Sequence, residues 1–449
     1  MITISAYQSA LALLAVLACA ATAGCRPNDD RKALIVVASG DTAGWIVPCG
    51  CTSNQSGGLP RRATYIEGLR QQSEVVPIDV GGAAHGTSSY DLAKFEAILR
   101  GEAMMNIAAH NIGAAEARLG PVELSRLAAK LGVPMLSANA SDRSGQLVAE
   151  PVRLVSAAGR RLALVGVLSE RYATAELRVS PPRQAAIEAL RSVAGKFDAA
   201  IVLAYLPEDE LRPFADALPE ADVVVGGPTD QPISPKQTGP TLLASATSKG
   251  KFLARLDAPA LRSADRWKGA IVELNEQFSD DARQMTGVDA FHAELARRDF
   301  TAAETGFAEP LPADLPKGFA VAGDKACRKC HEDACRQLRK SKHATAWKTL
   351  EAKGAHFDPD CQRCHTTGYG LPGGFASVRQ SAATVNVGCE SCHGPSQAHV
   401  ADSKVHTSYF AQAKDHCTGC HDRENSPKFD YDKYWEKIRH GQKASEGAP

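Results

Sequence analysis

Four repeats of the pattern Cys-x-x-Cys-His lie in the last third of this 449-residue chain and restrict its fold more than any other feature. Residues 321–449, which contain them, are poor in aliphatic runs and cannot build an ordinary hydrophobic core, so another source of cohesion is needed. The repeats are Cys327-Arg-Lys-Cys330-His331, Cys361-Gln-Arg-Cys364-His365, Cys389-Glu-Ser-Cys392-His393 and Cys417-Thr-Gly-Cys420-His421.

The spacing within each repeat predicts covalent attachment of c-type haem. Two thiols two residues apart reach the two vinyl groups of one porphyrin, and the His that follows lies beneath the iron as a ligand. A zinc ribbon would not need a His after every second Cys, a thioredoxin-like dithiol would need only one pair, and disulfides would need no His at all. We therefore expect four covalently bound c-type haems, whose macrocycles replace the missing core.

The other histidines of this segment are candidates for the second axial ligand that an electron-transfer haem usually takes. They are His343, His356, His399, His406, His416 and His440. His343 lies in a predicted helical stretch after the first repeat, His399 follows the third repeat, and His440 ends an amphipathic run. Spacing alone assigns none of them to a particular haem.

Residues 324–440 resemble the tetrahaem cytochrome c family that includes the electron acceptor of hydroxylamine oxidoreductase. The similarity lies in Ser-x-His343-Ala, in Thr-Thr-Gly-Tyr-Gly after His365, in Val387-Gly-Cys-Glu-Ser-Cys-His-Gly-Pro395 and in the helix ending at His440. The resemblance implies a mainly α-helical fold around closely stacked haems, with His343, His399 and His440 as distal ligands. It also implies that the haem held by His365 can lack a distal protein ligand, a position that His356, His406 or His416 could instead fill.

The N-terminal segment predicts export. Residues 10–24 are rich in Ala and Leu, carry no charge and lead into Thr-Ala-Gly-Cys25, which is typical of a secretion signal over residues 1–25. The small residues before Cys25 resemble a bacterial lipoprotein signal, which implies lipid attachment at Cys25; the alternative is ordinary cleavage near Ala23. No later stretch is long and apolar enough to span a bilayer. We expect an exported protein, periplasmic or attached to the outer membrane, with no transmembrane helix in the mature chain.

Residues 33–260 alternate short β-branched runs with helical stretches, which predicts a layered α/β domain. The expected strands are 33–39, 75–80, 135–138, 161–168, 200–206, 222–225 and 241–244. The expected helices are 59–70, 91–105, 122–131 and 184–193. Residues 261–320 are expected to form a polar helical segment without a strand, followed by a linker containing three prolines.

This first half resembles the metallophosphatase domain of the 5′-nucleotidase family. The landmarks are Asp41-x-x-Gly44, Gly57-Gly58-Leu-Pro-Arg-Arg-Ala63, Asp79-Val-Gly81, Pro134-Met-Leu-Ser-Ala-Asn139 and Asp222-Val-Val-Val-Gly-Gly227. The resemblance implies a two-sheet α/β sandwich that binds two divalent metals. Ala43, Gly82 and the Gly227-Pro-Thr-Asp230 segment stand where the family has metal ligands, and a dinuclear site needs those ligands. We therefore expect no phosphoesterase activity from Asp41, Asp79, Asn111 and Asp230.

Cys49 and Cys51 form an unusual Cys-Gly-Cys insertion where the resemblance places the metal site. One interpretation is a redox dithiol or a pair of soft-metal ligands. A disulfide across one residue closes a very small ring and should be easily reduced. The alternative is a strained disulfide or two inert thiols. Cys335 is expected to be a buried or spare helical thiol, and His85 and His110 to be ordinary loop or core histidines.

The charge balance of 51 basic and 51 acidic side chains argues against a globally basic nucleic-acid-binding protein. The sequence therefore predicts an exported multihaem cytochrome that transfers electrons between redox partner proteins, with the N-terminal domain as a docking or redox module. The alternative is an oxidoreductase of a small nitrogen or sulfur species, which would use an open haem or Cys49 and Cys51. A third interpretation is a residual metallohydrolase with a haem appendage.

Overall fold

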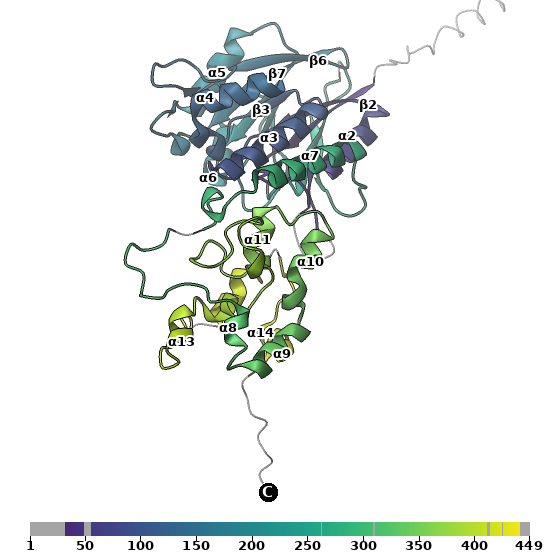
Figure 1. Ribbon diagram of the computed structural model, residues 1–449. Coiled ribbons are helices and arrows are strands. Elements are labelled where there is room, and N and C mark those ends of the chain that lie inside the picture. The colour runs from purple at the N-terminus through teal and green to yellow at the C-terminus, as the bar shows by residue number, and fades with distance from the viewer. Residues whose placement is uncertain are drawn as a thin grey trace, which may run out of the picture.

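The computed structural model describes residues 32–48, 55–261, 263–308, 310–410, 414–423 and 425–440. An α/β domain precedes a mainly helical C-terminal part, and Figure 1 shows the two packed against each other. The expected fold class is therefore confirmed. The predicted export signal, Cys25, Cys49 and Cys51 lie outside the described residues.

The α/β domain contains two six-stranded sheets. The first has the order β14-β13-β1-β2-β3-β4, and β1 to β4 run parallel. The buried side chains of β1 come from a continuous apolar run, as expected for a strand covered on both faces. Its strands are β1 (Ala33–Ser39), β2 (Ser73–Asp79), β3 (Ala109–Asn111), β4 (Met135–Leu136), β13 (Phe252–Asp257) and β14 (Lys268–Glu273).

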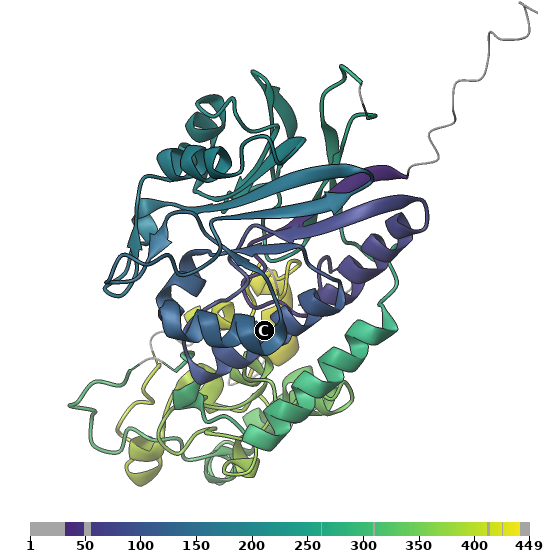
Figure 2. The same cartoon turned by 90° about the horizontal axis from the view of Figure 1, so that it is seen from above.

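The second sheet has the order β11-β12-β10-β9-β7-β6. An apolar layer that includes Val36, Ile78, Leu164 and Leu203 lies between the two sheets. Figure 2 shows the sheets stacked in this way, with the C-terminal part on the helix-covered side of the first sheet. The strands are β6 (Val152–Ala157), β7 (Arg160–Leu168), β9 (Ala199–Tyr205), β10 (Val223–Gly227), β11 (Ile233–Thr238) and β12 (Thr241–Ser245). A small separate sheet pairs β5 (Ala140–Ser141) with β8 (Arg178–Val179).

Helices cover the outer faces of both sheets. Those on the first sheet are α2 (Leu59–Arg70), α3 (Ser89–Met104), α4 (Ala114–Leu131) and α7 (Ala282–Arg298). Those on the second are α5 (Pro182–Ser192) and α6 (Glu208–Asp216). The Ser88 hydroxyl caps α3 in a reciprocal capping box with Asp91, which fixes where this helix begins.

The prediction that residues 261–300 contain no strand is wrong. β14 lies there and pairs antiparallel with β13, with Phe252 opposite Glu273. It is a half-exposed edge strand, so its polar side chains hide the alternation that marks a strand. Helix α7 follows and buries Val288, Phe291 and Leu295 against the α/β domain. The expected helical segment is present as α7, and residues up to about 300 pack with the first domain.

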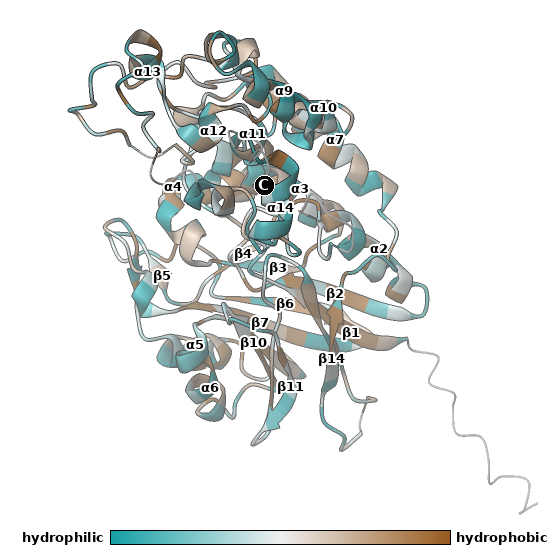
Figure 3. Cartoon of the chain, turned by 90° about the horizontal axis from the view of Figure 1, so that it is seen from below, coloured by the Kyte–Doolittle hydropathy of each residue, from teal (hydrophilic) through white to brown (hydrophobic). Residues whose placement is uncertain are grey.

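The C-terminal part is built from short helices. Its buried apolar cluster is small and centres on Trp347, Leu350 and Phe375, and Figure 3 shows α9 and α10 as largely hydrophilic. A cluster this small agrees with the expectation that the C-terminal segment lacks an ordinary hydrophobic core. The helices are α8 (Asp324–Cys327), α9 (Glu332–Lys340), α10 (Ala346–Glu351), α11 (Pro359–His365), α12 (Glu390–His393), α13 (Gln397–Ala401) and α14 (Tyr431–Ile438). Across the described ranges, no helix combines the length and apolarity needed to cross a membrane.

Candidate functional site

Three of the four histidines that end the repeats face a second histidine from elsewhere in the C-terminal part. The ring centroids of His331 and His399 are 6.1 Å apart. Those of His421 and His343 are also 6.1 Å apart, and those of His393 and His440 are 5.9 Å apart. Each pair therefore joins one repeat histidine to one of the three histidines that the resemblance implies as distal ligands.

The spacing of these pairs fits a metal ion between the two rings. An ion bound at about 2.0–2.1 Å from one nitrogen of each imidazole separates the ring centres by roughly 6 Å. Burial lowers the pKa of His343 and of His393, and the neighbouring His421 and His440 lower them further. Both rings are thus kept neutral, which is the form that binds a metal.

Three of these imidazoles, and His365 of the second repeat, are oriented by a hydrogen bond at Nδ1. The acceptors are the carbonyl oxygen of Ala346 for His365 (2.8 Å), that of Val405 for His399 (2.7 Å) and that of Ile438 for His440 (2.9 Å). His421 Nδ1 lies 3.1 Å from the Ser426 hydroxyl. A bond at Nδ1 leaves Nε2 as the ligating atom and fixes the ring plane, as is usual around metal-bound histidines.

Contacts between cysteines of different repeats place the repeats in a row. The Cys389 thiol lies beside the Cys327 thiol and lowers its pKa, so the first repeat adjoins the third. Burial and the adjacent Cys417 raise the pKa of Cys392 to about 11, so the third repeat adjoins the fourth. The Cys420 thiol lies beside the Cys364 thiol and lowers its pKa, so the second repeat adjoins the fourth. The spatial order is thus first, third, fourth, second.

The second-repeat end of this row contacts the α/β domain. The Tyr90 hydroxyl lies 2.5 Å from Asp358 Oδ1 and 3.1 Å from Asp360 Oδ2, and Lys94 forms an ion pair with Asp360. Burial, reinforced by Asp360, raises the pKa of Asp358. Burial would also raise the pKa of Asp360, but the Lys94 ammonium outweighs it and the pKa lies below its ordinary value.

Further contacts between the two parts fall on the same segment. The Asp299 carboxylate accepts hydrogen bonds from the Ser377 hydroxyl (2.8 Å) and from the backbone N–H groups of Val378 (3.0 Å) and Arg379 (3.1 Å). The Arg363 guanidinium lies over the Phe307 ring, 5.2 Å from its centroid. The α/β domain therefore contacts both the second repeat and the loop that follows it.

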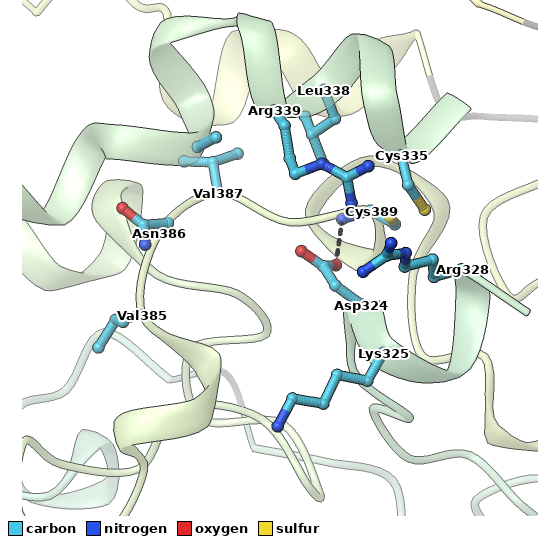
Figure 4. Close-up of a pocket in the computed structure, with 11 residues that line it drawn as sticks. Asp324, Lys325, Arg328, Cys335, Leu338, Arg339, Val385, Asn386, Val387 and Cys389 are labelled. Carbon is cyan, nitrogen blue, oxygen red and sulfur yellow. Dashed lines mark hydrogen bonds between the residues drawn. The ribbon is translucent and has the colours of Figure 1, made fainter. Parts of the chain in front are cut away.

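A cavity of about 250 Å³ lies between α8, α9 and the segment before the third repeat. Figure 4 shows Arg328 and Arg339 directed toward Asp324, whose Oδ1 accepts the backbone N–H of Cys389 at 3.0 Å. Cys335 lines this cavity and is buried on α9. Burial, with Cys327 nearby, raises the pKa of its thiol, so it is a poor nucleophile.

The α/β domain does not assemble the metal ligands of the family that it resembles. A Cβ at Gly82, where the family has a bridging Asp, would lie 2.7 Å from Cε2 of the Tyr205 ring. Asp41 Oδ2 accepts the Thr247 hydroxyl at 3.0 Å. The Asn111 amide donates to three backbone carbonyls, and Asp230 is exposed. These residues hold loops together rather than converging on an ion.

A second buried cluster lies deeper in the domain, and sequence reasoning missed it. Ligand atoms of Asp79, Glu102 and His110 lie within 4.8 Å of one another. Arg62 Nη1 is 3.4 Å from Asp79 and 3.7 Å from Glu102, so a guanidinium already supplies the positive charge there. Asp79 and His110 were considered separately from the sequence, whereas Glu102, a buried acid on α3, was not.

Comparison with known proteins agrees with this two-part architecture. Residues 326–394 match the family described as cytochrome c554 and c-prime. Cytochrome c-554 of Nitrosomonas europaea is 31% identical over 111 residues, which cover 21% of this chain and 46% of that protein. The chain thus spans less than half the length of this relative.

The α/β domain is similar to solved phosphoesterase structures. A 5′-nucleotidase precursor from Thermus thermophilus superposes with a TM-score of 0.51 at 18% identity, covering 59% of each chain. The calcineurin-like phosphoesterase YfkN from Bacillus subtilis gives a TM-score of 0.51 at 15% identity, covering 59% of this chain and 97% of that one. These similarities establish the fold alone. The chain therefore joins an α/β domain with a metallophosphatase-like fold to a mainly helical C-terminal segment, in which residues 326–394 match the cytochrome c554 and c-prime family.

Proposed function

We propose that this protein is an exported multihaem c-type cytochrome that carries four covalent haems and relays electrons between redox partner proteins. The observation that carries the proposal is the set of three histidine pairs with ring centroids 5.9–6.1 Å apart. Each pair includes the histidine of one Cys-x-x-Cys-His repeat. A bound haem supplies reversible one-electron chemistry at its iron.

The residues of the chain hold and orient the haems. The thioether cysteines are Cys327 and Cys330, Cys361 and Cys364, Cys389 and Cys392, and Cys417 and Cys420. The proposed axial pairs are His331 with His399, His393 with His440 and His421 with His343, while His365 ligates the haem of the second repeat. Hydrogen bonds at Nδ1 keep His365, His399, His421 and His440 in fixed orientations.

The spatial order of the repeats defines the two ends of this relay. Electrons would pass between the first repeat, where Cys330 and His331 are exposed, and the second repeat, which adjoins the α/β domain. The α/β domain is then a docking or redox module at one end of the row. Residues 1–25 would direct export, and a lipid at Cys25 would hold the mature protein at a periplasmic or outer-membrane surface.

Deleting single haems tests the relay. Cys417→Ser with Cys420→Ser removes the haem between the third and second repeats, whereas Cys327→Ser with Cys330→Ser removes the one at the end of the row. After pulse reduction, we expect slow equilibration among the remaining haems in the first variant and near wild-type equilibration in the second. Equal rates in both variants would show that the repeats do not form a relay in this order.

A second candidate function is favoured by the position of the loop that leads to Cys49. A Cβ at Gly44, in the described stem of this loop, would lie 3.2 Å from Lys94 Cε, and Lys94 pairs with Asp360 beside the second repeat. An oxidoreductase of a small nitrogen or sulfur species would use Cys49 and Cys51, or an open haem at His365. Oxidation of the dithiol to a disulfide would release two protons to solvent and two electrons, and two bound haems would supply one-electron acceptors for them.

Sulfite, hydroxylamine and nitrite are suitable probes of this alternative. Cys49→Ser with Cys51→Ser should abolish any haem oxidation or reduction that these compounds cause, while the control Cys335→Ser should retain it. Unchanged reactions in the double variant would exclude Cys49 and Cys51 and leave the open haem at His365 as the reacting site. A wild-type protein whose haems none of the three compounds oxidises or reduces would leave electron transfer alone as the function.

A further inference from the structure

Tyr90 and Lys94 reach from the α/β domain to the helix that carries the second repeat. They lie four residues apart on α3, so both side chains leave the same face of that helix. Their partners, Asp358 and Asp360, stand at the start of α11, immediately before Cys361.

The hydroxyl of Tyr90 is held in a fixed position. Its ring is fully buried and packs edge-on against Phe300 at 5.8 Å and Phe307 at 5.7 Å between centroids. Asp358, which accepts this hydroxyl, is also the N-cap of α11 and accepts the backbone N–H of Asp360 at 3.0 Å. The position at which α11 begins is therefore tied to the core of the other domain.

We propose that Tyr90 and Lys94 are positioning residues that set the reduction potential of the haem at the second repeat. Of the four haems, this one would then have the potential that depends on contacts with the α/β domain. The inference rests on the proposed function, because it requires a haem at Cys361 and Cys364. It goes further by giving two residues of the α/β domain a specific role, although this domain does not assemble the metal ligands of the family that it resembles.

The direction of the effect follows from charge. A haem that goes from ferric to ferrous gains one electron, so a nearby negative charge opposes reduction and a positive charge favours it. Lys94 neutralises the Asp360 carboxylate one residue before Cys361, and its own side chain is only 11% exposed. Without this ammonium the Asp360 carboxylate at the attachment site would lose its ion-pair partner and would keep only the weaker interactions with Arg363 and the Tyr90 hydroxyl. The haems further along the row would be affected less, because the interaction falls with distance and is screened by salt.

A redox titration of the holoprotein followed by absorbance tests this proposal. We expect Lys94→Met to move one of the four one-electron steps to lower potential and to leave the other three in place. Tyr90→Phe, which keeps the ring and removes the two hydrogen bonds, should move the same step in the same direction. Lys94→Arg should restore the wild-type step.

Lys130→Met is the matched control, because Lys130 also belongs to the α/β domain and pairs with an acid, Glu96, away from α11. It makes the same change in charge and should move no step. Four unchanged steps in Lys94→Met, or four steps that shift together, would overturn the proposal. So would a lower melting temperature with unchanged potentials, since that result marks a purely structural contact. A wild-type protein with no haem at the second repeat would instead refute the proposed function.

Discussion

His343 lies opposite His421 with 6.1 Å between the centroids of the two imidazole rings, although one follows the first repeat and the other ends the fourth. This arrangement means that the partner of the fourth-repeat histidine is supplied by a segment distant in sequence. Of the repeats that follow one another along the chain, the third and fourth are adjacent in the row, whereas the first and second, and the second and third, are not.

Replacing His343 by Ala should leave haem content unchanged, because Cys417 and Cys420 still form the thioethers. One haem should become high-spin, since it loses a strong-field ligand. Electron paramagnetic resonance of the oxidised protein measures this change. His406→Ala is the control, because the His406 ring stacks on Phe410 at 4.3 Å instead of facing a repeat histidine. A fully low-spin spectrum in His343→Ala would rule out His343 as a ligand.

Replacing Asp299 by Ala should loosen the junction between the two parts. Its carboxylate accepts three hydrogen bonds from residues 377–379, and its backbone has φ of +48°, which Ala adopts at a cost. Leaving the buried Ser377 hydroxyl and two partly buried backbone N–H groups unsatisfied should lower the free energy of unfolding by about 3 kcal/mol. Chemical denaturation measures the loss, and the exposed Asp289→Ala on the preceding helix serves as the control. Equal stability of the two variants would contradict the role of Asp299.

The buried pair of Glu102 and His110 should make the α/β domain less stable at alkaline pH. Burial alone would lower the pKa of His110, but Glu102 at 2.8 Å and Glu116 raise it well above its ordinary value. Burial also raises the pKa of Glu102. The folded chain therefore binds more protons than the unfolded chain, and stability falls as pH rises.

The contribution of His110 is complete below its unfolded pKa of about 6.5 and is lost as the pH rises through its folded pKa. Above pH 6.5 the slope should approach about 1.4 kcal/mol per pH unit. The double variant Glu102→Gln with His110→Gln should flatten this dependence, whereas His292→Gln with Glu294→Gln on α7 should not. Denaturation curves between pH 6 and 9 measure the slope, and a steep slope in the first variant would contradict the assignment.

Much of the fold could be predicted from apolar periodicity. The predicted strand 33–39 and helix 59–70 coincide with β1 and α2, because both consist of clear apolar patterns between turn residues. β14 and β11 were missed because they are half-exposed strands at the edges of the sheets, and β3 because it has only three residues. Neither a half-exposed edge strand nor a three-residue strand shows a clear apolar pattern in the sequence.

Each repeat could be recognised in the sequence because its residues are consecutive in the chain. The spatial order of the repeats could not be predicted. That order depends on contacts such as Cys327 with Cys389 and Cys364 with Cys420, which join residues far apart in the chain. The contact of Tyr90 with Asp358 escaped prediction for the same reason, since it joins two domains. The structure instead supplies these long-range relationships.

Counting the haems of the purified holoprotein and recording their spin states tests the central claim most directly. The account predicts four covalent haems per chain, at least three of them low-spin with two imidazole ligands, corresponding to the pairs of His331 with His399, His393 with His440 and His421 with His343. Fewer than four covalent haems, or fewer than three with two imidazole ligands, would contradict it.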